Sequence, residues 1–192
     1  MLAQTFLTLL ATAATFVAAA PTGTDPSSNL PTKTHARSRI THSVVAGRGG
    51  LRFDPESIFA EAGSIVEFHF TPLNHSVVEA AFDRPCVPRD ANSFFSGFFP
   101  VARPADGSAV QSEEVFQIEV TDPNKPIWFY CAQNTGRHCQ SGMVGVINPK
   151  VDSDKTLSKF RELAAQVEGP SGVQPYVQGG WRGPNPNPLS GF

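Results

Sequence analysis

The chain has 192 residues, of which 40% are hydrophobic and 15 are phenylalanine, so it can form one core of ordinary domain size. Only 17% of the residues are charged, and the formal net charge of −2 is spread without long runs of one sign. This composition excludes the basic stripe of a nucleic-acid-binding protein and the polybasic segment that binds an anionic membrane.

Residues 1–20 form an apolar stretch that ends in three alanines, which is the pattern of a secretory signal peptide and its cleavage site. Threonines interrupt the stretch and no basic stop-transfer flank follows it, which favours cleavage over a transmembrane anchor. No other stretch is apolar enough to cross a bilayer, and the C-terminus lacks the hydrophobic tail of a lipid-anchor signal. We therefore expect a secreted protein that is extracellular or associated with the cell wall.

Residues 21–39 are rich in Pro, Ser and Thr and predict a flexible arm. Over residues 40–150, short runs rich in Val, Ile and Phe alternate with turn-forming clusters, which is typical of one antiparallel β-sandwich or barrel. The expected strands are Ile40–Ala46, Ser57–Ala60, Ser64–Phe70, His75–Phe82, Glu114–Val120, Pro126–Cys131 and Met143–Asn148.

The segment 151–168 appends a helix to the sandwich. Apolar residues recur there at three- and four-residue spacing and predict a helix near residues 154–168. Asp152 or Ser153 can cap its start, and Gly169-Pro170 can end it. Residues 169–192 mix Gly, Pro and Asn without periodicity, so we expect a disordered tail, in which Trp181 could still dock.

The chain has three cysteines, an odd number that is unusual in a secreted protein. One of them must be a ligand, an intermolecular bridge or a free thiol. If Cys131 is a metal ligand, Cys86 and Cys139 remain to form a disulfide.

A thiolate, an imidazole and a thioether follow one expected strand within 13 residues, as Cys131, His138 and Met143. Two His and one Cys with a weak axial Met suit copper that shuttles between two oxidation states. The second His must come from another strand, and His75 at a strand start can supply it. Zinc is less suited to this set because a thioether is a poor fourth ligand.

The segments Asn74–Val77, Phe129–Cys131 and His138–Met143, together with Cys86, resemble the phytocyanins, which are the plastocyanin-like cupredoxins with a disulfide beside the copper. The segments Trp128–Cys131 and Gly142–Pro149 more closely resemble the extracellular cupredoxin-like proteins of fungi.

The resemblance covers roughly His42 to Pro149. It implies an all-β fold, a Greek-key cupredoxin β-sandwich, that holds one type 1 copper ion. By this resemblance His75, Cys131 and His138 are equatorial ligands and Met143 is the axial one. Six residues separate Cys131 from His138, where phytocyanins usually have four, so we expect a more flexible ligand loop.

Other residues leave alternatives open. His35, His42 and His69 are extra ligand candidates, but we expect surface or hydrogen-bonded histidines there. The apolar segment Phe94–Phe99 is either core or an exposed rim for a redox partner.

No Ser-His-Asp set, paired carboxylates or His-x-His pair stands out, so no catalytic residue and no enzyme activity are predicted. We expect a monomeric blue-copper protein that exchanges single electrons with a redox partner protein or a small-molecule reductant. The alternative is an extracellular cell-wall or host-interface binding module in which copper is structural, sequestered or absent.

Overall fold

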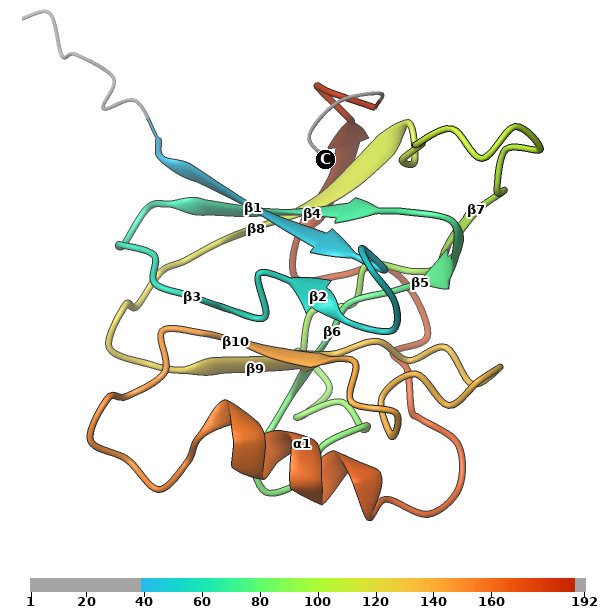
Figure 1. The fold of residues 1–192 in the computed structure, drawn as a ribbon. Coiled ribbons are helices and arrows are strands. Elements are labelled where there is room, and N and C mark those ends of the chain that lie inside the picture. The colour runs from blue at the N-terminus through green and yellow to red at the C-terminus, as the bar shows by residue number, and fades with distance from the viewer. Residues whose placement is uncertain (1–38, 189–192) are drawn as a thin grey trace, which may run out of the picture. The chain divides into compact units, whose positions relative to one another are not determined.

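The computed structural model describes residues 39–188. The expected signal peptide and nearly all of the expected arm lie outside this range, as do residues 189–192. Figure 1 shows two stacked β-sheets with a helix, α1, below the second sheet. In the described part of the chain, the predicted all-β sandwich with one helix near its C-terminal end is confirmed.

The strands of the described part are, in chain order, β1 (Thr41–Ala46), β2 (Phe53–Asp54), β3 (Ser57–Ile58), β4 (Ile65–Phe70), β5 (Leu73–His75), β6 (Val78–Ala80), β7 (Phe99–Val101), β8 (Glu114–Glu119), β9 (Ile127–Tyr130), β10 (Val144–Ile147) and β11 (Trp181–Pro184). The first sheet has the order β11-β8-β4-β1-β2, and the second has the order β3-β10-β9-β6. β5 and β7 pair with each other alone. β1 runs parallel to β4, and β3 runs parallel to β10; the other pairs are antiparallel.

The second sheet is mostly apolar on both faces because it lies between the first sheet and the helix. On β9, Phe129 packs toward the first sheet, while Trp128 and Tyr130 pack toward the helix side. This division follows from the alternation of side chains along a strand. A strand that is covered on both faces therefore has a continuous run of apolar residues in its sequence, as Ile127–Tyr130 has.

Apolar and polar residues alternate imperfectly along β4, because polar side chains are buried on one of its faces. Phe68 faces the core between the sheets, whereas Glu67 and His69 are buried on the other face. The two ring nitrogens of His69 contact Glu67 Oε1 at 2.9 Å and Gln111 Oε1 at 2.8 Å. His69 is thus a hydrogen-bonded histidine, as the sequence led us to expect. Because Glu67 and Gln111 form hydrogen bonds with His69, these polar groups can be buried on this face of β4 without unpaired hydrogen-bonding atoms.

Several strand boundaries differ from the expectation. The predicted strand His75–Phe82 is divided between β5 and β6, because the chain leaves the β5–β7 pair after His75 and joins the second sheet at Val78. The short strands β2 and β7 were not predicted, since two or three residues are too few to show an alternating pattern. In the Phe94–Phe99 segment, Phe94, Phe95 and Phe99 are core and only Phe98 is exposed.

The expectation of a disordered tail is wrong for residues 169–188. Residues 181–184 form β11, which pairs antiparallel with β8 at the edge of the first sheet. The strand is mostly exposed on its surface, so it has no apolar alternation to read. Backbone hydrogen bonds fix it, together with the Arg182 guanidinium, which donates to the carbonyl oxygens of Ser96 and Phe98 at 2.9 Å each.

The helix α1 spans Leu157–Ala165, within the predicted segment. Its N-cap is Thr156 rather than Asp152 or Ser153, and the Thr156 side chain accepts from the backbone N–H of Lys159. Phe160 is fully buried beside Trp128, with 4.9 Å between ring centroids. Within residues 39–188, no helix has both the length and the apolar character needed to cross a membrane.

Candidate metal centre

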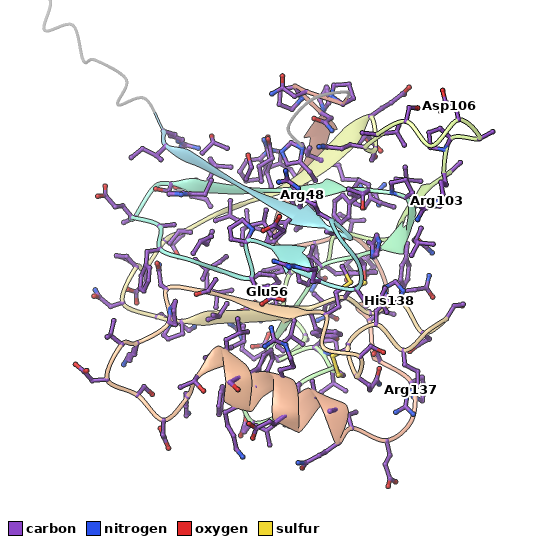
Figure 2. All side chains as sticks on the ribbon, viewed as in Figure 1. Arg48, Glu56, Arg103, Asp106, Arg137 and His138 are labelled. Carbon is purple, nitrogen blue, oxygen red and sulfur yellow. A yellow bond between two sulfur atoms is a disulfide. The ribbon has the colours of Figure 1, made fainter. Side chains whose placement is uncertain are left out.

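Three of the four candidate ligands, His75, Cys131 and His138, meet at one end of the sandwich, and the backbone of Met143 lies beside two of them. His75 is the last residue of β5, Cys131 directly follows β9, and His138 and Met143 lie in the loop from β9 to β10. Figure 2 shows His138 at the end of the molecule where this loop projects. Residues far apart in sequence thus reach one place through the pairing of β6, β9 and β10.

The side chains of His75, Cys131 and His138 face one another. One nitrogen of each histidine and the cysteine sulfur all lie within 4.8 Å of one another. Cys131 Sγ is 3.9 Å from His75 Nδ1 and 3.4 Å from His138 Nδ1. The exposed fractions of the three residues are 0%, 0% and 4% in chain order, so bulk water is largely excluded from the cluster.

Met143 is held next to this trio by its backbone. Its N–H donates to the His138 carbonyl at 2.9 Å, and its carbonyl accepts from the Cys131 N–H at 3.1 Å. The side chain is fully buried in the same apolar cluster as Cys131. The backbone of Met143 is therefore adjacent to Cys131 and His138, and its side chain belongs to the apolar core that includes Cys131.

Ser76 organises the surroundings of the sulfur. Its backbone N–H donates to Cys131 Sγ at 3.4 Å, and its hydroxyl oxygen accepts from the Ala132 N–H at 3.0 Å. Hydrogen bonds to a sulfur ligand tune the metal that it binds. Ser76 was not predicted to take part in the site, although its position directly after His75 was a usable signal.

Burial keeps the cluster uncharged in the absence of a cation. It raises the pKa of the Cys131 thiol to about 11. Burial, followed by the proximity of His138, lowers the pKa of His75 to about 4. Burial also lowers the pKa of His138. Neutral imidazoles are ready to act as ligands, whereas the thiol must lose its proton when it binds a metal.

Gly47 lies against the other edge of the His75 ring. A Cβ on Gly47 would stand 2.3 Å from His75 Nε2 and 2.5 Å from Thr71 Oγ1. The residue also has φ of +92°, which glycine adopts without strain. Only glycine therefore fits here, and nothing in the local sequence indicated this role.

The long ligand loop has its own hydrogen bonds. The His138 N–H donates to the Gln133 carbonyl and the Arg137 N–H donates to the Asn134 carbonyl, each at 3.0 Å. Arg137 has a φ of +50°, which turns the chain into His138. The loop is thus built from tight turns rather than left without partners.

The segment that follows the helix ties this loop down from outside. The Asn134 side chain accepts from the Ser171 N–H at 2.7 Å and donates to the Ser171 carbonyl at 3.3 Å. The Arg137 guanidinium donates to the Val167 carbonyl at 2.9 Å, and the Gln140 amide donates to the Gly169 carbonyl at 3.1 Å. We expected a flexible loop from its length, but its hydrogen bonds to residues 167–171 hold it in place in the folded chain.

The disulfide lies directly beside His138. Cys86 and Cys139 are bonded, with 5.7 Å between their Cα atoms, which is the pairing that remains when Cys131 is taken as a metal ligand. Cys131 remains as a buried free thiol among the described residues. The bridge fixes the ligand loop to the segment that follows β6.

No protein-family model matches the chain. A protein of Arthroderma benhamiae named "Probable GPI-anchored cupredoxin-1" is 35% identical over 130 residues, which are 68% of this chain and 61% of that protein. A second protein of the same fungus, named "Extracellular serine-rich protein", is 34% identical over 143 residues, or 74% of this chain and 52% of that protein. The chain thus spans less than two thirds of the length of either relative.

Among solved structures, a pseudoazurin from Hyphomicrobium denitrificans is 19% identical, with a TM-score of 0.40, over 67% of this chain and 99% of its own. A plastocyanin from Dryopteris crassirhizoma is 23% identical, with a TM-score of 0.35, over 57% of this chain and 100% of its own.

The names of the two fungal relatives confirm the predicted extracellular or cell-wall location. The resemblance inferred from the ligand motif is likewise confirmed: the chain is similar to one fungal protein that is named as a cupredoxin and to a second that is named as extracellular.

Proposed function

We propose that this chain is an extracellular blue-copper protein that carries single electrons. One copper ion would be held by His75, Cys131 and His138, with Met143 as the weak axial ligand. The observation that supports this proposal is the convergence of two Nδ1 atoms and one Sγ atom within 4.8 Å at buried positions.

The chemistry of the donors fits copper better than other metals. Two imidazoles and a thiolate with a thioether nearby match the preferences of copper in an electron-transfer site. Among the residues that the structure describes, no carboxylate joins the cluster, so the hard ligands that favour magnesium, calcium or manganese are missing from it. When bound, copper would supply a one-electron change of oxidation state.

The protein would contribute orientation and exclusion of water. Ser76 donates its backbone N–H to Cys131 Sγ, and this bond would help to stabilise a thiolate there. Gly47 packs against the His75 ring, and the turns of the ligand loop position His138. A donor set held in place before the electron arrives needs little rearrangement afterwards.

A visible absorption titration tests this proposal. The purified protein is titrated with cupric ion, beside the variants Cys131→Ser and His42→Gln, the latter altering a histidine outside the cluster. We expect an intense blue charge-transfer band that saturates at one copper in the wild type and in the His42 variant. The band should be absent from the Cys131 variant and bleach reversibly with reductant.

A colourless copper-treated protein, or a spectrum that the Cys131 substitution leaves unchanged, would refute the proposal. Either result would turn attention to the alternative of an extracellular binding module without a redox metal.

A further inference from the structure

A cavity of about 430 Å³ lies next to the metal-ligand cluster, on the far side of Gly47. Gly47 lines this cavity, and its backbone also packs against Nε2 of His75. The opposite ring nitrogen of His75, Nδ1, is the one that faces Cys131. A molecule in the cavity would therefore be separated from the imidazole by little more than one glycine.

Three segments form the walls. They are the turn Gly47–Gly50, the pair Thr71–Pro72, and the loop after β7, which contributes Arg103 and residues 107–110. Glycines at positions 49 and 50 have open space beside them, so the turn leaves its backbone accessible. Figure 2 shows Arg103 and His138 at the same end of the molecule.

The charged side chains that line the cavity are both basic. They are Arg48 and Arg103, although the whole chain has 15 basic and 17 acidic residues. Arg48 is oriented by Asp54, which lies 3.5 Å from its Nε. Within the described part of the chain, Arg103 is exposed and forms no ion pair.

We propose that this cavity binds a small organic anion that carries two carboxylates. A guanidinium presents a planar pair of N–H donors that matches a carboxylate, which makes arginine the preferred residue for such recognition. Two guanidiniums on separate segments suit two carboxylates on one short molecule. The volume is that of a small-molecule site rather than of a polymer groove.

The cavity differs from the metal cluster in its ligand chemistry. It offers cationic donors and backbone, whereas the cluster offers a thiol and two neutral imidazoles. The inference therefore does not depend on copper, and it can be tested on the metal-free protein.

The test is an NMR titration of the isotope-labelled, metal-free protein with succinate, with its neutral analogue succinamide as the ligand control. We expect saturable shifts of the Gly47, Gly49 and Gly50 amides and of the His75 ring with succinate. Succinamide should produce no such shifts. The Arg103→Gln variant should bind succinate about tenfold more weakly, since a hydrogen bond to a charged group is lost.

Arg39→Gln is the matched protein control, because Arg39 is an exposed arginine outside the cavity. It should bind succinate like the wild type. Equal weakening by the two variants, equal shifts with succinamide, or shifts confined to other surfaces would each overturn the inference. A protein that binds succinate in this way but takes up no copper would refute the proposed function and leave this site standing.

Discussion

At the residue scale, the orientation of each ring decides what the cluster can hold. His75 and His138 both direct Nδ1 at Cys131 Sγ, and their ring centroids are 5.0 Å apart. Residues without a ligand atom set this arrangement: Gly47 leaves room for one ring, and Ser76 fixes the sulfur. Substitutions beside the cluster should therefore affect metal binding as much as some substitutions within it.

Gly47→Ala should lower copper affinity by at least tenfold, because the new methyl group would overlap His75 Nε2 and displace the ring. Gly49→Ala is the matched control, since Gly49 also has a positive φ, +71°, but has open space beside it. Copper titration followed by the blue band measures both affinities. Equal affinities in the two variants would show that the close contact has no bearing on the ligand.

Glu79 provides a prediction about pH. Burial raises its pKa above the usual 4.5, against the attraction of Arg89, with which it is paired. The folded state therefore binds this proton more tightly than the unfolded state. Its contribution to stability is full below pH 4.5 and is lost as the pH rises through the folded pKa.

We expect the free energy of unfolding of the wild type to fall, relative to that of Glu79→Gln, as the pH rises from 4 to 7. Urea unfolding of the metal-free proteins at several pH values measures this difference. A difference that stays constant or grows with pH would contradict the assigned direction.

At the scale of elements, the ligand loop and the segment after α1 depend on each other. The side-chain amide of Asn134 forms two hydrogen bonds with the backbone of Ser171, one as donor and one as acceptor. The Tyr130 hydroxyl donates to the Gly172 carbonyl at 2.8 Å. Asn134, which lies between Cys131 and His138, supplies part of this contact. The ligand loop thus has a structural counterpart in the C-terminal segment.

Asn134→Ala should lower the free energy of unfolding by about 1–2 kcal/mol, because two hydrogen bonds at a part-buried position are lost. Amide hydrogen exchange should become several-fold faster at Arg137 and His138 but not in β8. Asn124→Ala, at an exposed turn, is the control and should leave exchange in the loop unchanged. Unchanged exchange in the Asn134 variant would mean that the loop is rigid without this contact.

At the scale of the whole molecule, the disulfide joins two parts of the chain that no described sheet pairs directly. Cys86 and Cys139 are separated by 53 residues and are both fully buried against the helix side of the second sheet. The bridge therefore restricts a long loop in the unfolded chain.

Replacing both cysteines by alanine should lower the free energy of unfolding by roughly 4 kcal/mol, the value expected from loop closure. Denaturant unfolding of the metal-free protein measures this loss. A loss below about 1 kcal/mol would contradict the loop-closure argument and would mean that the bridge restricts the unfolded chain little.

The sequence by itself determined the features that local pattern encodes. Apolar runs predicted β1, β4, β8, β9 and β10 to within a residue or two, and apolar spacing predicted α1. The spacing of Cys131, His138 and Met143 indicated a soft-metal site, because a thiol, an imidazole and a thioether are ligand groups that can be recognised from residue type alone.

The tertiary structure alone decided what depends on contacts between distant backbones. Gly47 against His75, Ser76 at the sulfur, β11 on β8 and residues 167–171 on the ligand loop all involve backbone groups or the absence of a side chain. Every residue except proline has the same N–H and C=O, so such contacts leave no signature in residue type. They appear only when folding brings the segments together.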